Sequence, residues 1–442
     1  MSKRNFVLFI ILLIIILIVG LWFFSAYKNP NGGEDGGGTN FWSKFNPFGS
    51  PAPTNNEKNL DGEVNIGENT DTTQGETIIP KLQKISSVPV AGFQIFNKER
   101  FKEEIIPVVS DTTPSTTSTK KTPPATEKVE AVRYVDRLSG NIYQTFLDKI
   151  EERRFSNTMI PKIYEAVFGN NDSTVLMRYL KSDDQTIETF SGIIPKEVLG
   201  ADTNSNEIKG TFLPENITDF ALSPDKNKIF YLTVDINDNA TGNISTLSDT
   251  TKKTAVFTSP FSEWLPDWPN LNLITLTTKP SAYALGYMYA LNPTTKSFSR
   301  VLEGLPGLTT LTSPSGKTVL YADNGLLLNT FDMTKNTSKD LGLRTMPEKC
   351  VWGKNSDTLY CAVPKDTPTE LYPDAWYQGE VSFSDQIWKI DLTSGNNTLL
   401  VDPITEPGGE EIDGIKLAID ASGKYLFFVN KKDSYLWRLD LE

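Results

Sequence analysis

The sequence predicts an all-β fold, a seven-bladed β-propeller, with six or eight blades as open alternatives. Two observations lead to this prediction. Helical periodicity is nearly absent from about residue 81 onward, and one pattern, a polar turn followed by an apolar strand, occurs six times. Repeats at intervals of about forty residues are typical of propeller blades. The copies are GNNDSTVLM (169–177), SPDKNKIFY (223–231), WPNLNLITL (268–276), SPSGKTVLY (313–321), GKNSDTLYC (353–361) and DASGKYLFF (420–428).

A second pattern, an amphipathic strand followed by a turn and another strand, lies downstream of most copies. Examples are GYMYALNPTTKSFSRVL (286–302), LLLNTFDMTKNTSKDLGL (326–343) and QIWKIDLTSGNNTLLV (386–401). Together the two patterns supply four strands per unit.

A seventh unit precedes the six copies. We expect its inner strand at 89–96, its middle strands at 129–136 and 140–147, and its outer strand at 151–157. A Ser/Thr/Pro-rich insertion at 98–128 separates the first two strands, and its composition predicts disorder.

The ends of this region predict how the ring closes. The last unit stops at Glu442 after three strands, whereas KLQKIS (81–86) precedes the first unit and has no blade of its own. We expect 81–86 to be the outer strand of the last blade, since an open ring would expose strand edges. The insertion PKDTPTELYPDAWYQGEVSFSD (364–385) then falls on the face opposite the one that this segment enters.

The SPDKNKIFY and SPSGKTVLY copies, with the hairpins that follow them, resemble the repeats of TolB-type and WD-repeat-like β-propellers. The resemblance covers roughly residues 81–442. The Gly-His and Trp-Asp signature of true WD repeats is missing. The resemblance implies a rigid module that works by binding or scaffolding proteins.

Residues Phe6 to Phe24 form an uncharged apolar run that is long enough to span a membrane. The run predicts a transmembrane helix at 6–25, and the flanking cations predict a cytoplasmic tail at 1–5. A composition rich in Gly, Asn, Thr and Pro predicts a flexible linker at 26–80. The predicted location is the cell membrane, single-pass, with the propeller (81–442) outside the cytoplasm. A cleaved signal peptide is the alternative. Within the linker, FWSKFNPF (41–48) is either a docking motif or a segment that packs on its own domain.

Composition excludes several functions. With 43 basic and 55 acidic residues the net charge is −12, so nucleic acid is not an expected partner, and a protein of the cell envelope is. There is no histidine, which removes His-dependent catalysis and His-ligated zinc. We expect no cofactor and no metal.

Three local patterns are interpreted as structural. The segment DINDNATGN (235–243) has some calcium-loop spacing but lacks the Gly and the Glu of such a loop, so we expect a polar hairpin loop. Trp264 and Trp268 are expected to pack between blades. Glu410, Glu411 and Asp413 are expected to form a solvated loop.

The two cysteines, Cys350 and Cys361, flank a predicted two-stranded hairpin. If Trp352 pairs with Leu359, the cysteines face one another at a distance suited to a disulfide. Two buried free thiols are the alternative.

The insertion at 364–385 carries Tyr372, Trp376 and Tyr377 beside Asp374. Aromatic residues in a surface insertion are good contact residues, so these four are the candidate binding residues. The alternative is that they fold back and cover the edge of the blade. No catalytic residue is predicted.

We therefore expect a membrane-anchored extracytoplasmic β-propeller that binds or scaffolds a protein or ligand. The alternative is an enzyme, a carboxylate-dependent hydrolase or lyase with its site at the propeller channel.

Overall fold

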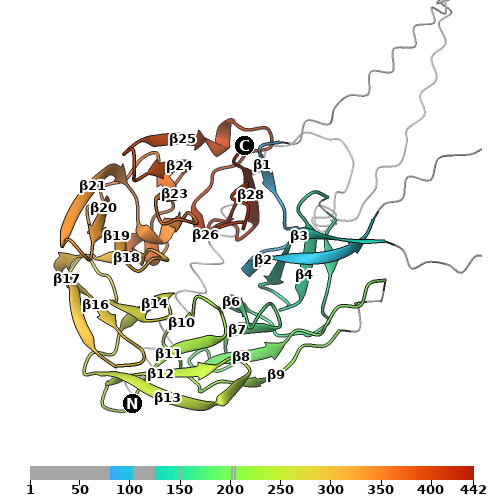
Figure 1. The fold of residues 1–442 in the computed structure, drawn as a ribbon, viewed down its shortest axis with the longest axis horizontal. Coiled ribbons are helices and arrows are strands. Elements are labelled where there is room, and N and C mark those ends of the chain that lie inside the picture. Colours follow the sequence, from blue (N-terminus) through green and yellow to red (C-terminus); the bar gives the residue numbers. More distant parts are fainter. Residues whose placement is uncertain (1–79, 103–124, 150, 201–202, 204–205) are drawn as a thin grey trace, which may run out of the picture. The chain divides into compact units, whose positions relative to one another are not determined.

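The computed structural model describes residues 80–102, 125–149, 151–200, 203 and 206–442, which lie within one compact unit, Glu76–Glu442. They form seven four-stranded antiparallel sheets arranged in a ring (Figure 1). A seven-bladed β-propeller is therefore the fold, as predicted.

The segments predicted as cytoplasmic tail, transmembrane helix and linker, and the FWSKFNPF segment, lie outside the described residues and stay predictions. None of the helices in the described part of the chain has the length and apolar character needed to cross a bilayer.

The blades are numbered along the chain, and the strands of each are given from the innermost outward. Blade 1 is β2 (Val90–Phe101), β3 (Thr126–Asp136), β4 (Ile142–Phe146) and β5 (Arg153–Arg154); blade 2 is β6 (Ile163–Gly169), β7 (Thr174–Leu180), β8 (Ile187–Ile193) and β9 (Lys209–Phe212); blade 3 is β10 (Phe220–Leu222), β11 (Lys228–Val234), β12 (Ala240–Thr246) and β13 (Asp249–Ser259). Blade 4 is β14 (Trp264–Asn270), β15 (Leu273–Thr278), β16 (Leu285–Leu291) and β17 (Phe298–Pro306); blade 5 is β18 (Thr309–Thr312), β19 (Thr318–Ala322), β20 (Leu327–Asp332) and β21 (Thr337–Arg344). Blade 6 is β22 (Cys350–Trp352), β23 (Thr358–Pro364), β24 (Asp385–Asp391) and β25 (Asn397–Val401); blade 7 is β26 (Gly414–Ile419), β27 (Tyr425–Asn430), β28 (Leu436–Asp440) and β1 (Leu82–Lys84).

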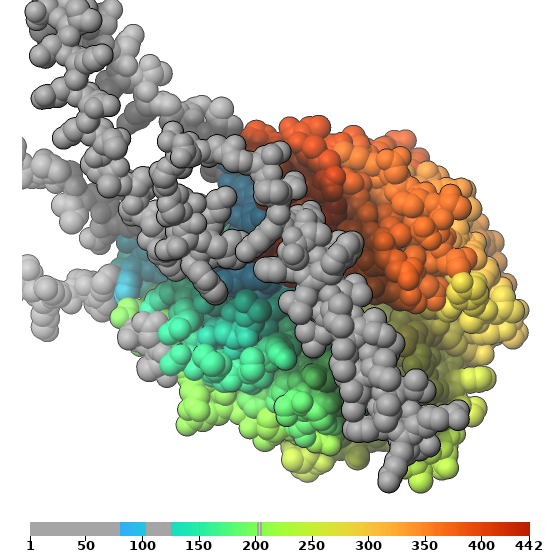
Figure 2. Space-filling model, turned by 180° about the vertical axis from the view of Figure 1, so that it is seen from behind, coloured from blue at the N-terminus to red at the C-terminus, as the bar shows by residue number. Residues whose placement is uncertain are grey.

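Blade 7 joins the two ends of the described region. Strand β1 pairs with β28, with Leu82 opposite Leu439, and Ile85 N donates to Leu436 O at 2.8 Å. The view from behind shows the blue β1 segment beside the dark-red last blade (Figure 2). The predicted closure by residues 81–86 is confirmed for this strand.

Antiparallel order gives the ring two faces. The innermost strand of every blade begins on the face that carries the second-to-third-strand loops and the connections between blades. We call it the insertion face, because the 364–385 insertion joins β23 to β24 there. The opposite face carries the first-to-second and third-to-fourth turns.

The repeated turn has a local cause. In blade 3 the Ser223 hydroxyl accepts from Lys228 N at 2.9 Å, and in blade 5 the Ser313 hydroxyl accepts from Thr318 N at 3.1 Å. Both serines are buried. The side chain replaces a backbone acceptor at the turn and so favours it over other local structure.

Apolar side chains of neighbouring blades pack on each other. Trp264 and Trp268 of β14 are each 4% exposed and pack in one cluster with Phe230 and Leu232 of blade 3. Their predicted role in packing between blades is confirmed.

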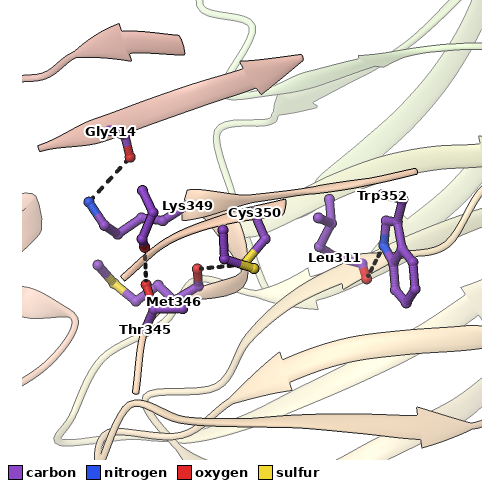
Figure 3. The surroundings of a disulfide bond; sticks show 9 residues. Leu311, Thr345, Met346, Lys349, Cys350, Trp352 and Gly414 are labelled. Atoms are coloured by element: carbon purple, nitrogen blue, oxygen red, sulfur yellow. Dashed lines mark hydrogen bonds between the residues drawn. A yellow bond between two sulfur atoms is a disulfide. The ribbon is translucent and has the colours of Figure 1, made fainter. Parts of the chain in front are cut away.

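Blade 6 begins with the predicted hairpin. Cys350 pairs with Cys361, and Trp352 pairs with Leu359. The two sulfur atoms are bonded and buried (Figure 3). The structure thus has the cross-strand disulfide and not two free thiols.

The disorder predicted for the whole of 98–128 is wrong at its ends. The β2–β3 ladder continues to the pair Phe101 and Thr126, so residues 98–101 and 126–128 are strand. These strand ends carry many polar side chains, so the sequence did not identify them as strand. Residues 103–124 lie outside the described part.

We predict that Leu82→Ala lowers the free energy of unfolding by about 2–5 kcal/mol, because it leaves a cavity beneath the strand that closes the ring. Leu82 is 2% exposed and packs with Leu439 and Trp437. Guanidinium titration of the purified protein measures the change. Thr211→Ala in the exposed outer strand of blade 2 is the control and should change stability by less than about 0.5 kcal/mol. If both variants lowered the free energy of unfolding equally, this would contradict the prediction that β1 stabilises the closed ring.

Candidate functional site: the insertion face of the propeller

The insertion between β23 and β24 folds back onto the ring. It contains one short helix, α2 (Asp374–Tyr377), and its aromatic residues join an apolar cluster. Tyr372 and Trp376 are each 4% exposed and pack with Leu326, Met346 and Phe383. The insertion thus buries most of its aromatic surface against the blades that surround it.

Polar contacts from the insertion reach beyond blade 6. Asp374 Oδ2 accepts from Ala282 N in a loop of blade 4 at 2.6 Å. Trp376 Nε1 donates to Asp413 Oδ2, just before blade 7, at 3.0 Å. The amine of Lys431, at the end of β27, donates to Trp376 O at 2.5 Å and lies over the indole ring. These hydrogen bonds therefore connect blades 4, 6 and 7 on the insertion face.

This placement corrects part of the sequence interpretation. Tyr372 and Trp376 were expected to be surface contact residues, but both are buried, and the alternative of folding back describes them. Tyr377 stays partly exposed, and its hydroxyl donates to Glu348. Asp374 is partly buried and holds a backbone amide. The fold brings the four residues together, and two of them are inaccessible to a partner.

A buried charge cluster lies under the insertion. The Lys349 amine is 2.7 Å from Asp385 Oδ2, also contacts Asp413, and donates to Gly414 O at 3.2 Å. All three charged side chains are 0% exposed. Lys349 comes from the 3₁₀ turn η2 (Pro347–Lys349) that precedes blade 6. Sequence reasoning missed this cluster, because its three members lie 28 or more residues apart and only folding brings them together.

The solvated loop predicted for Glu410, Glu411 and Asp413 is wrong for one member. Glu410 and Glu411 form partly exposed ion pairs with Lys84 and Lys432. Asp413, in contrast, is fully buried, because the insertion covers it and supplies hydrogen-bond donors.

Three acidic residues lie on or just before innermost strands, toward the insertion face. Glu165 is on the innermost strand of blade 2, Asp219 directly precedes that of blade 3, and Glu348 precedes that of blade 6. Burial, and then repulsion by Glu165, raises the pKa of Asp219 to about 7. Burial also raises the pKa of Glu348. Arg178 neutralises Glu165 through a contact of 2.8 Å.

An open aromatic groove lies between blades 3 and 4 on the same face. It has a volume of about 580 Å³. Apolar and aromatic side chains make up most of its wall, and its rim carries Asp238, Glu263 and Lys279. The residues that form the wall include Phe261, Trp264, Leu285, Tyr287 and Tyr289.

The groove combines a rigid floor with an exposed rim. Trp264 Nε1 donates to Phe261 O at 2.9 Å, and its ring contacts Tyr289 edge-on at 5.8 Å. Phe261 and Leu285 are 67% and 57% exposed. Trp264 was predicted only to pack between blades, and its burial agrees with that prediction. The cluster FSEWLPDW was the signal for a groove here, but it did not show that Phe261 stays exposed.

The predicted polar hairpin loop is present at 235–239, whereas residues 240–243 belong to strand β12. Asp235 Oδ1 accepts from Asn237 N at 2.8 Å and from Asn239 N at 2.9 Å. Its carboxylate thus stabilises the β11–β12 turn. Within the described part of the chain, no group of three acidic or sulfur ligands is placed to hold a metal ion.

Comparison with solved structures finds other proteins of related shape. An oligogalacturonate lyase in complex with manganese is 10% identical, with a TM-score of 0.48, over 71% of this chain and 86% of that one. An oligogalacturonate lyase from Vibrio parahaemolyticus is 8% identical, with a TM-score of 0.45, over 81% and 99%. The tricorn protease is 14% identical, with a TM-score of 0.35, over 68% and 27%. These likenesses assign no activity, ligand or metal to this chain.

No family model matches the sequence, and no curated protein matches it.

We predict that Asp219 makes the protein less stable as pH rises. Between about pH 4 and about pH 7 the folded state holds a proton that the unfolded chain has lost, so the free energy of unfolding falls across this window. Asp219→Asn removes this contribution, and its free energy of unfolding should fall less between about pH 5 and about pH 8 than that of the wild type. Urea titrations at both pH values measure the difference.

The matched control is Asp183→Asn. Hydrogen bonds from Thr186 and Gln185 lower the pKa of this exposed carboxyl to about 2, so it does not titrate in the same window. Identical pH dependence in Asp219→Asn and the wild type would contradict the raised pKa.

Proposed function

We propose that this protein is a binding module that holds a segment of a partner protein in the aromatic groove between blades 3 and 4. The observation that carries the proposal is the open groove itself, with a fixed tryptophan floor and exposed Phe261 and Leu285 at its edge. Aromatic anchors in a preformed hollow are typical of residues that dominate binding energy.

The surroundings of the groove support a protein ligand. Ile236 and Tyr283 are 99% and 79% exposed in neighbouring loops of blades 3 and 4. Exposed apolar side chains close in sequence to groove residues add to the apolar surface that an interaction site offers. The segment that suits it carries an aromatic or aliphatic side chain for the groove and polar groups for the rim at Glu263 and Lys279.

The location of this activity is part of the proposal. A transmembrane helix at 6–25 with a cytoplasmic N-terminus would hold the propeller outside the cytoplasm at the cell membrane, where an envelope protein is the expected partner. The charge of −12 supports a partner other than nucleic acid.

An enzyme is the second candidate, and one observation favours it. A carboxyl with a pKa of about 7, as at Asp219, suits a general acid or base of a hydrolase or lyase near the channel. Turnover of a glycan or peptide substrate panel that is lost in Asp219→Asn and kept in Phe261→Ala would favour the enzyme over the binding module.

We predict that Phe261→Ala and Leu285→Ala each weaken partner binding about tenfold, roughly 1.4 kcal/mol, because each removes apolar contact from the groove. A displayed library of random peptides is selected on the full-length protein, and the affinity of each selected peptide is then measured for every variant.

Leu138→Ala is the matched control, since Leu138 is 69% exposed on the same face but belongs to blade 1. Its affinity should equal that of the wild type. Peptides that bind the wild type and both groove variants equally would contradict the proposal.

A further inference from the structure

Neither closure of the ring nor binding in the groove requires the buried cluster of Lys349, Asp385 and Asp413. One ammonium faces two carboxyl groups, all with side chains that are 0% exposed. If all three were ionised, the cluster would keep an uncompensated negative charge out of water, which is costly. A proton held on one carboxyl removes that charge.

The two carboxyl groups are not equivalent. Asp413 accepts from Trp376 Nε1 at 3.0 Å, Phe383 N at 3.1 Å and Ser382 Oγ at 3.2 Å. Several donors aimed at one carboxyl stabilise its ionised form. Asp413 is therefore the carboxyl of the pair that accepts more hydrogen bonds.

Asp385 is the carboxyl on which a proton is better accommodated. Its Oδ2 accepts from Gly414 N at 2.6 Å, whereas its Oδ1 is buried without a hydrogen-bond partner. Burial, more than the nearby Asp413, raises the pKa of Asp385 to about 6, although Lys349 opposes the shift. A neutral carboxyl of this kind is a better electrophile than a carboxylate.

Aromatic rings enclose the Lys349 amine. It lies 5.3 Å from the centre of the Trp376 ring and 5.4 Å from that of Phe383. Figure 3 shows Lys349 beside Cys350, with its amine directed toward Gly414. Water is excluded from this amine. A nucleophile and its target that are held in a fixed geometry, here the Lys349 amine and the Asp385 carboxyl, can react without an external catalyst.

We propose that Lys349 and Asp385 join in an intramolecular amide bond, with Asp413 as the proton acceptor. Asp413 first takes a proton from the Lys349 ammonium. The lone pair of the neutral amine then attacks Cγ of the protonated Asp385, and Gly414 N–H stabilises the negative charge that develops on Oδ2.

The step is balanced without a cofactor. The new C–N bond forms, the bond from Cγ to Oδ1 breaks, and a proton from the nitrogen moves to Oδ1, which leaves as water. Asp413 retains the first proton. The products are one amide, one water and a neutral Asp413, and nothing is oxidised or reduced.

The bond would join the turn before blade 6 to the first residue of β24, where the insertion ends. Beside it, the Cys350–Cys361 disulfide links β22 to β23. The base of the insertion would thus be fixed covalently on both sides, whether or not the groove binds a partner.

The test is the intact mass of the full-length protein after reduction of the disulfide and denaturation. We expect the wild type to be one water lighter than its sequence requires. We expect the full mass of its own sequence for each of the variants Lys349→Arg, Asp385→Ala and Asp413→Ala. All masses are compared for protein that begins at the same N-terminal residue. Lys431→Arg is the matched control, since this lysine also contacts Trp376, and it should still lose one water.

Peptide mapping decides which residues are joined, and it does not depend on folding of the variants. We expect one branched peptide in the wild-type digest that joins the segment containing Lys349 to the segment containing Asp385. A wild type of full mass without that peptide would overturn the proposal. A branch on Asp413, or water loss that persists in Lys349→Arg, would overturn it as well.

Discussion

Closure of the ring through one short strand is the constraint on which the rest of this structure depends. Blade 7 takes three strands from the end of the chain and its fourth, β1, from before blade 1. Apolar clusters lie between neighbouring blades, and the one beside blade 7 includes Leu82 of the closing strand. The pair of β1 and β28 therefore stabilises residues that are far from it, as loss of one blade edge would expose strands on both sides.

On the insertion face, one loop stabilises the propeller and leaves the groove between blades 3 and 4 open. The insertion at 364–385 buries Tyr372 and Trp376, and reaches residues of blades 4 and 7. The contacts of this loop are made within the chain, and its burial removes Tyr372 and Trp376 from the accessible surface. The open surface lies instead over blades 3 and 4, where short loops leave Phe261 and Leu285 exposed.

Two kinds of polar chemistry are separated on this face. At the insertion-face side of the innermost strands, Glu165, Asp219 and Glu348 belong to different blades, and burial raises the pKa of Asp219 to about 7 and raises that of Glu348. Under the insertion, Lys349 and the carboxyl groups of Asp385 and Asp413 are buried and have no contact with water. The first set suits contact with a ligand, whereas the second suits chemistry within the chain, because only there is water excluded.

The sequence by itself determined the all-β class, the seven units, the disulfide register and the strand that closes the ring. These follow from local patterns: Ser-Pro turns that specify a hairpin, alternating apolar residues that specify strands, and an unpaired segment at one end that matches a missing strand at the other. Tertiary structure alone decided which side chains meet. Trp376 looked like a surface residue and is buried, Asp413 looked solvated and is buried, and Lys349 gave no signal at all. Burial and contact between blades depend on residues separated by tens to hundreds of positions, and no local pattern records them.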